Sequence, residues 1–183
     1  MTAEELASRL TGDFGARFAE DLAARVLEAD ALGSLYAFAT EPCAGLSADG
    51  RHKLTFRSAY VLERIYFGAH KRFEPFADRF CRVDFHTCTD PGARRHFGKI
   101  MTDLLARFSP APEIWDAIAA TAAGWAIDPA AKVAVRIWAV EILKICRARV
   151  PWVADSWDDL VETQLNAPTP GLCARWRGSW QAG

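Results

Sequence analysis

Apolar residues recur along this chain at the three- and four-residue spacing of an α-helix, and no segment shows the sustained two-residue alternation of a half-buried strand. Prolines separate the periodic segments, as expected because proline fits the first turn of a helix and not its interior. The pattern therefore predicts an all-α protein with one loop at 41–50, a short apolar piece at 32–39, and helices at 3–11, 13–29, 51–70, 74–86, 91–108, 112–127, 130–150, 151–166 and 171–180.

Two of these segments carry sharper signals than apolar spacing alone. Thr2 followed by Glu5 has the spacing of a capping box, which predicts that the first helix begins at residue 3. The segment 130–150 is apolar nearly all round, which predicts a buried central helix.

One pattern occurs twice, 38 residues apart. Asp90-Pro91 and Asp128-Pro129 each precede a long apolar segment, and aspartate followed by proline is a favourable helix start. A shift of 38 residues superimposes apolar positions of the two copies, and a shift of 42 also aligns Arg94 with Arg136. The repeating unit is thus a pair of helices of about 40 residues, and such pairs bury their apolar faces by stacking on one another.

An Asp-Pro pair, a basic residue soon after it and then a long aliphatic helix resemble the second helix of a HEAT-like repeat. Asp90, Pro91, Arg94 and Arg95 carry this resemblance best, and it covers residues 49–183. The segments 57–65 and 94–100 are also similar to a group of short, uncharacterised bacterial HEAT-like proteins. The resemblance implies a single domain over residues 1–183, an α-α superhelix of about four helix pairs, in which residues 1–48 form an N-terminal helical cap.

The composition excludes several classes of protein. Half of the 183 residues are hydrophobic and a quarter are charged, which is an ordinary globular mixture. No apolar run is long enough to span a membrane, and the N-terminus lacks the features of a signal peptide. The five cysteines are widely spaced among apolar residues, as reduced core thiols are, so a cytoplasmic location is expected.

Charge bears on the choice of partner. The net charge is −1, although residues 49–110 contain twelve basic and seven acidic residues. Proteins that bind nucleic acid through a basic groove, as some HEAT-like DNA glycosylases do, usually carry a clear basic excess. Nucleic acid is therefore disfavoured as a partner but retained as the alternative, with Lys99 and the arginines discussed next as its candidate contacts.

Arginines recur near the repeat length and lie on or beside apolar stripes, where a guanidinium needs an acceptor. They are Arg57, Arg94, Arg95, Arg136 and Arg175. One interpretation is a structural ladder in which Asp90 or Asp128 accepts from these guanidiniums. The other is a row of guanidiniums on the concave face, available to carboxylates or phosphates of a ligand.

Candidate catalytic chemistry is sparse. Cys81, His86, Cys88 and His96 form the one metal-like cluster, but they lack the tight paired spacing of structural zinc sites, so no metal or cofactor is expected. No nucleophile elbow, P-loop or dinucleotide-binding glycine pattern occurs. The paired carboxylates of Asp158 and Asp159 are expected on a solvated helix face.

Seven tryptophans are many for a chain of this size. Trp115, Trp125, Trp138 and Trp157 lie at apolar helix positions and are expected in the core. Trp152, Trp176 and Trp180 lie nearer the C-terminus, where they either cap the last repeat or anchor a partner. Taken together, the sequence predicts a protein–protein interaction scaffold that uses its concave face and is not an enzyme.

Overall fold

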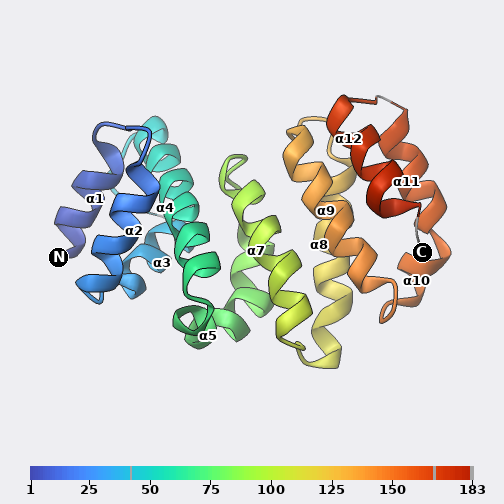
Figure 1. Ribbon diagram of the computed structural model, residues 1–183, viewed down its shortest axis with the longest axis horizontal. Coiled ribbons are helices and arrows are strands. Elements are labelled where there is room, and N and C mark those ends of the chain that lie inside the picture. The colour runs from blue at the N-terminus through green and yellow to red at the C-terminus, as the bar shows by residue number, and fades with distance from the viewer. Residues whose placement is uncertain (42, 167, 182–183) are drawn as a thin grey trace. The chain divides into compact units, whose positions relative to one another are not determined.

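The computed structural model describes residues 1–41, 43–166 and 168–181, and within them the regular structure is helical, with no β-strand (Figure 1). This confirms the predicted all-α class. Pro42, part of the predicted loop at 41–50, lies outside the described residues. The α-helices are α1 Ala3–Thr11, α2 Phe18–Glu28, α3 Leu32–Thr40, α4 Ala48–Gly68, α5 His70–Arg79, α6 Phe85–Thr87, α7 Ala93–Arg107, α8 Trp115–Ile127, α9 Val133–Cys146, α10 Pro151–Asp155, α11 Trp157–Leu165 and α12 Pro170–Arg175.

Short stretches of other helix types join them: a 3-10 helix at Pro112–Ile114 and π-helices η1 at Phe80–Asp84 and η3 at Trp176–Trp180. Within the described residues, none of these helices combines the length and the apolar character needed to cross a membrane.

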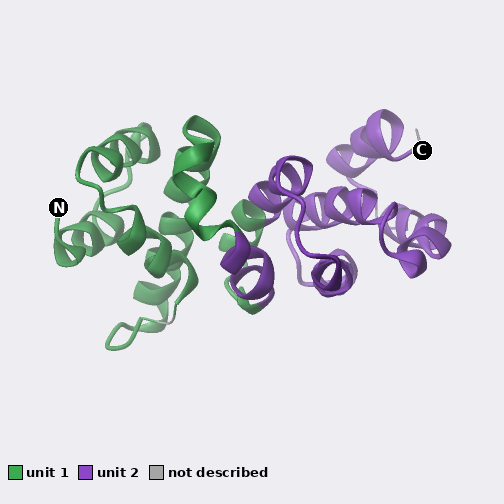
Figure 2. Cartoon of the chain, turned by 90° about the horizontal axis from the view of Figure 1, so that it is seen from below, with its two compact units in different colours: residues 1–77, 87–97 green, residues 78–86, 98–183 purple. Residues whose placement is uncertain are grey.

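The chain divides into two compact units (Figure 2). Unit 1 contains Met1–Ala77 and Thr87–Phe97, and unit 2 contains Asp78–His86 and the chain from Gly98 onward. Helices α5 and α7 each contribute residues to both units. The expected boundary between cap and repeats at residue 48 falls inside unit 1, so the first helices and the start of the predicted repeat region belong to one compact unit.

Unit 1 is organised around α4. Helices α1, α2 and α3 all contact α4, which buries Leu54, Val61, Leu62 and Ile65. The predicted capping box is present: the Thr2 hydroxyl accepts from the Glu5 amide at 3.1 Å, and the Glu5 carboxylate accepts from the Thr2 amide at 2.9 Å. Because the cap satisfies amides that the helix leaves unpaired, α1 begins at the predicted residue.

The first Asp-Pro pair starts a helix, as predicted. The Asp90 carboxylate accepts from the amides of Gly92 and Ala93 at 2.9 and 2.8 Å, and α7 follows directly. Gly92 is needed here because a Cβ at this position would lie 2.7 Å from the Phe56 ring. The close approach of α4 and this turn in unit 1 therefore depends on a residue without a side chain.

The second Asp-Pro pair does not cap a helix, which corrects the prediction. The Asp128 carboxylate accepts from the Ala130 amide at 2.9 Å, and its carbonyl accepts from the Ala131 amide. These bonds close a turn over residues 128–131, and α9 begins only at Val133, with Lys132 as its N-cap. An aspartate can satisfy either a turn or a helix end, and here Oδ1 of Asp128 accepts from an amide of the local turn.

Unit 2 is built on the packing of α8 against α9. Helix α9 buries Val135, Val140, Ile142 and Leu143, as expected for a central helix, but it is shorter than the predicted 130–150. Gly98 of α7 lies against α9, where a Cβ would come within 2.9 Å of the Trp138 Cβ. Two helices can approach this closely only where one of them carries glycine.

Candidate functional site

Four of the five predicted arginines bind groups of the chain itself. Arg57 donates to the carbonyls of Leu10 and Gly12 at 2.9 and 2.5 Å, and its guanidinium lies 5.0 Å from the Phe14 ring centroid. These carbonyls are at the C-terminal end of α1, where helix carbonyls lack intrahelical partners and attract cations. Arg57 thus joins α4 to α1.

The next three arginines also have acceptors within the protein. Arg94 donates to the Cys88 carbonyl at 3.1 Å, Arg136 to the Gln164 side chain at 3.0 Å, and Arg175 to Glu141 at 3.3 Å. Gln164 is fully buried and itself donates to the Ala126 carbonyl at 3.1 Å. Arg95 differs, because it is exposed and makes no hydrogen bond or ion pair with the described residues.

Each of the predicted aspartate acceptors binds at least one group that is not an arginine. Asp90 pairs with His52, whose Nδ1 lies 2.6 Å from the carboxylate, and Asp128 closes the turn before α9. The acceptors of Arg57, Arg136 and Arg175 are instead carbonyls, an amide and a glutamate. Arg57, Arg136 and Arg175 thus join segments that are distant in the sequence, and the Asp-Arg ladder stays a prediction.

A pocket of about 360 Å³ lies in the C-terminal part of unit 2. Three indoles line it: Trp157 from α11, and Trp176 and Trp180 from η3. Asp158 and Glu162 of α11 also line it, as does Arg147, the residue that follows α9. We call this the C-terminal pocket, and it combines aromatic walls with charges of both signs.

Arg147 stacks on one wall of the C-terminal pocket. Its guanidinium lies 4.6 Å from the centroid of the Trp157 ring, a cation–π distance. It makes no hydrogen bond or ion pair with the described residues, although two carboxylates line the same pocket. A half-buried guanidinium held only by an aromatic face is an unusual arrangement, since arginine normally finds hydrogen-bond acceptors.

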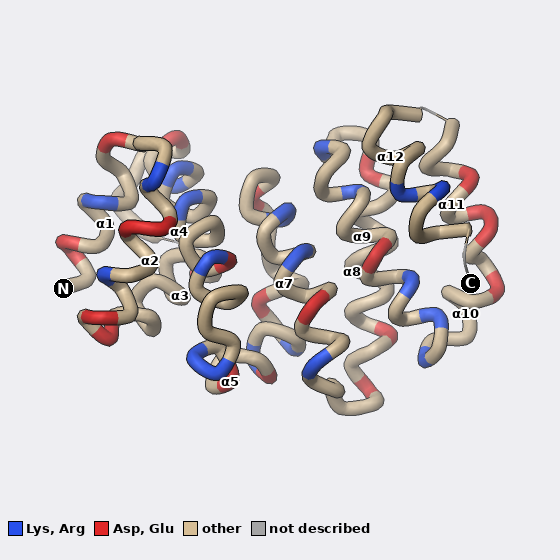
Figure 3. Tube along the Cα trace, in the orientation of Figure 1, with Lys and Arg blue, Asp and Glu red and all other residues tan. Residues whose placement is uncertain are grey.

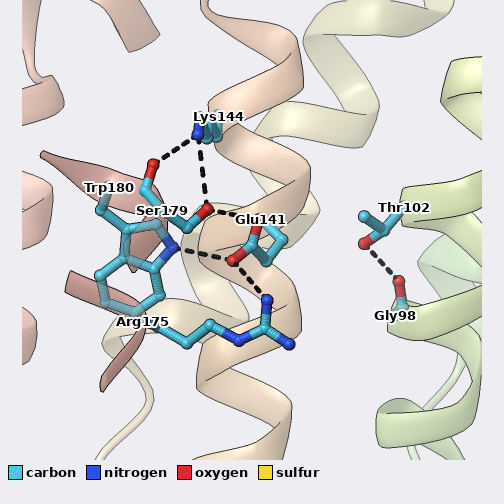
Figure 4. Close-up of polar contacts among 7 residues, drawn as sticks. All are labelled: Gly98, Thr102, Glu141, Lys144, Arg175, Ser179 and Trp180. Carbon is cyan, nitrogen blue, oxygen red and sulfur yellow. Dashed lines mark hydrogen bonds and ion pairs between the residues drawn. The ribbon is translucent and has the colours of Figure 1, made fainter. Parts of the chain in front are cut away.

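Glu141 holds another wall in place (Figure 4). Its carboxylate accepts from the Trp180 indole at 3.1 Å, from Arg175 at 3.3 Å and from the Ser179 hydroxyl at 3.4 Å. Lys144, one turn later on α9, donates to the Ser179 carbonyl. The end of the chain is therefore attached to α9 through one carboxylate and one ammonium, and the Trp180 ring that lines the pocket is fixed by this attachment.

The surface beside the pocket is acidic. Residues 151–166 contain no lysine or arginine, and α11 appears in Figure 3 with acidic positions only. The carboxylates of Asp155, Asp158, Asp159 and Glu162 recur at helical spacing, are exposed, and pair with no cation among the described residues. The predicted solvated placement of Asp158 and Asp159 is confirmed, and Asp155 and Glu162 are exposed as well.

Sequence reasoning placed the tryptophans only in part. Trp115, Trp125 and Trp157 are buried as predicted, whereas Trp138 is half-buried. Trp180, for which the sequence left a capping and an anchoring role open, is 3% exposed, and its indole donates to Glu141. The sequence offered no signal for Glu141 or Arg147, because their roles depend on residues 30 or more positions away or on a neighbouring helix.

The predicted metal-like cluster is distributed over separate environments. Cys81 and Cys88 are buried, and burial raises the pKa of each thiol to about 12. His86 contacts the Thr121 hydroxyl at 2.7 Å and the Cys81 carbonyl at 2.8 Å. Among the described residues no group of three or more potential ligands is placed to hold a metal ion.

Sequence reasoning also missed a buried pair in unit 1. His96 Nδ1 lies 2.5 Å from the Glu63 carboxylate, and both side chains are nearly inaccessible. The rings of Phe56 and Tyr60 flank the imidazole at 5.5 and 5.2 Å, and Nε2 of His96 has no hydrogen-bond partner. Glu63 is 6% and His96 3% exposed, so the pair belongs to the core of unit 1.

Comparisons with protein-family models, with curated proteins and with solved structures find no match to this chain.

Proposed function

We propose that this protein is a cytoplasmic HEAT-like helical-repeat scaffold that works by binding a protein partner and not by catalysis, and that the partner inserts a side chain into the C-terminal pocket. The repeat assignment is supported by buried apolar residues at equivalent positions of the two copies, such as Leu104 and Ile142 or Leu105 and Leu143. The binding assignment is supported by the pocket.

The observation that carries the proposal is a pocket of about 360 Å³ walled by Trp157, Trp176 and Trp180. Tryptophan and arginine are the residues most enriched among those that dominate protein–protein binding energies. Trp180 is held by Glu141 and Trp157 is packed in the core, so two of the three walls are preformed. A preformed aromatic pocket loses little conformational entropy when a partner binds.

The state of the arginines favours this proposal over binding of nucleic acid. Phosphate binding requires basic side chains that are free to contact the backbone of the nucleic acid. Arg57, Arg94, Arg136 and Arg175 each donate to groups of the chain. Of the five arginines, only Arg95 makes no hydrogen bond or ion pair with the described residues. We therefore place the binding surface at the C-terminal pocket and not along a row of guanidiniums on the concave face.

Selection from a random peptide display library tests the proposal, using the protein as bait and the Trp176→Ala variant as the matched counter-bait. Trp176 is half-buried and its indole makes no hydrogen bond in the described chain, so its removal alters the pocket with little expected effect on the fold. We expect a consensus peptide that binds the wild type and loses at least about tenfold in affinity for the variant. A consensus that binds both proteins equally, or no consensus, would overturn the proposal.

Fluorescence anisotropy with duplex and single-stranded DNA at low salt tests the alternative, with an Arg94→Ala/Arg95→Ala variant as control. We expect no salt-sensitive binding. Binding that weakens with salt and disappears in the variant would replace the scaffold proposal with nucleic-acid recognition.

A further inference from the structure

The C-terminal pocket already contains a cation supplied by the protein. The Arg147 guanidinium lies 4.6 Å from the Trp157 ring centroid and pairs with no acceptor among the described residues. The Arg147 guanidinium therefore covers the face of the Trp157 indole, and the cation–π contact is its one polar interaction with the described residues. A guanidinium from another chain has the same shape and charge, so it could contact the same indole face if Arg147 moved away.

The other walls offer further sites for a cation. The negative potential over an indole face attracts cations, and tryptophan does so most strongly among the aromatic side chains. The Nε1 proton of Trp180 is donated to the Glu141 carboxylate at 3.1 Å, and a bond to an anionic acceptor polarises the donor ring toward more negative charge. Trp176 adds a second indole in the same π-helical turn.

The charge around the pocket is complementary to a cationic ligand. Asp158 and Glu162 line the pocket against the single positive charge of Arg147. Asp155 and Asp159 are further exposed acids of the same segment, and residues 151–166 contain no basic side chain. A basic segment would therefore be attracted toward the pocket before contact, and an acidic one would be repelled.

Resting on the function proposed above, we infer that the C-terminal pocket is a receptor for an arginine or lysine side chain of a basic peptide segment, and that Arg147 is an internal competitor for it. Because Arg147 is tethered beside Trp157, it occupies this face at a high effective concentration. A ligand cation must displace it or bind beside it against charge repulsion. Removal of the Arg147 charge should therefore strengthen binding, which is the opposite of what removal of a ligand-contacting residue does.

The test is fluorescence anisotropy with two labelled peptides, one alternating arginine with glycine and one alternating glutamate with glycine. Wild type, Arg147→Gln, Trp176→Ala and Glu162→Gln are compared, and Glu74→Gln, an exposed acid of unit 1 outside the pocket, controls for the loss of one negative charge. Circular dichroism confirms that each variant is folded.

We expect the arginine peptide to bind about three- to tenfold more tightly to Arg147→Gln, and about three- to tenfold more weakly to Trp176→Ala and Glu162→Gln, with Glu74→Gln unchanged. Binding of the glutamate peptide that Arg147→Gln abolishes would overturn the inference while leaving a binding pocket. Arginine-peptide binding that Glu74→Gln weakens as much as Glu162→Gln would show general charge attraction and also overturn it. Binding of neither peptide would overturn it too, and the library selection then decides the proposed function separately.

Discussion

The indole of Trp180 donates to the carboxylate of Glu141 at 3.1 Å, across 39 positions of sequence. This bond attaches the last helical turn of the described chain to α9 and fixes one wall of the C-terminal pocket. Arg175 and Ser179 bind the same carboxylate. A single acidic side chain thus controls both the attachment of the C-terminal segment and the shape of the candidate site.

Replacement of Glu141 by alanine should release this segment. The three donors of Trp180, Arg175 and Ser179 lose their acceptor, and we expect a loss of about 1–3 kcal/mol in the free energy of unfolding. Acrylamide should also quench the tryptophan fluorescence more strongly in the native variant. Glu141→Gln keeps one carbonyl oxygen as acceptor and should lose less. Equal effects of the two substitutions would show that the carboxylate hydrogen bonds are not what holds the segment.

The buried pair of Glu63 and His96 should be among the costliest positions to disrupt in unit 1. Glu63→Ala removes the partner of Nδ1 in a histidine whose Nε2 already has none. We expect a loss of about 3–5 kcal/mol, because breaking a buried pair leaves a desolvated polar group unpaired. Urea denaturation measures it, with Glu63→Gln as the conservative control. A loss below about 1 kcal/mol for Glu63→Ala would contradict the assignment of this pair to the core.

Glycine should be required at position 98 and dispensable at position 124, although both lie in helices. A Cβ at Gly98 would meet the Trp138 Cβ at 2.9 Å, so Gly98→Ala should cost about 1–3 kcal/mol through overpacking. A Cβ at Gly124 would meet nothing within 4 Å, so Gly124→Ala should be neutral or stabilise by about 0.5–1 kcal/mol through helix propensity. Thermal unfolding compares the two variants, and a destabilisation of equal size would refute the packing argument.

The five cysteines should separate into two reactivity classes. Burial raises the pKa of Cys81, Cys88 and Cys146 to about 12, so their reactive thiolate form is scarce at neutral pH. Cys43 and Cys173 are only half-buried. A colourless thiol reagent that releases a coloured product should therefore modify Cys43 and Cys173 first in the native protein, and all five thiols in denaturant. Mass spectrometry identifies the modified residues, and early labelling of Cys146 would contradict the described core.

Stability should decline in mild acid because of His86. Burial lowers the pKa of this histidine below its ordinary value of 6.5, and the hydrogen bond to the Cys81 carbonyl only partly opposes the shift. Above pH 6.5 the ring is neutral in both the folded and the unfolded chain, so it contributes no pH dependence. Below that value the unfolded chain binds a proton that the folded chain resists, so the free energy of unfolding falls.

Urea midpoints of the wild type and of His86→Gln, measured from about pH 7.5 down to about pH 5.5, check this expectation. The wild type should lose stability more steeply than the variant over this range. Parallel curves would mean that His86 titrates in the folded protein as it does in the unfolded chain.

Neighbouring residues were sufficient to predict that the chain is helical and where several helices begin, but not every helix end: α5 begins at His70 and holds Pro75 in its interior, where a helix start at residue 74 was predicted. The capping box of Thr2 and Glu5 and the Asp90 cap act within three residues, and the apolar spacing that defines α4, α7 and α8 repeats within each helix. Such interactions involve residues that are close in the sequence, so they can be predicted from the sequence alone. The same locality explains the error at Asp128, where a turn and a cap compete for one carboxylate and the sequence pattern is the same for both.

The candidate site depended on tertiary structure. Arg57, Arg136 and Arg175 were recognised as arginines that need acceptors, but their acceptors lie 28 to 47 positions away and include carbonyls that every residue possesses. No sequence pattern points to Glu141 or Arg147. Glu141 can bind the C-terminal segment, and Arg147 can compete with a ligand cation, only when folding brings indoles beside them. Helices follow from contacts between near neighbours, whereas a pocket follows from packing between distant ones, and packing is decided by the whole chain.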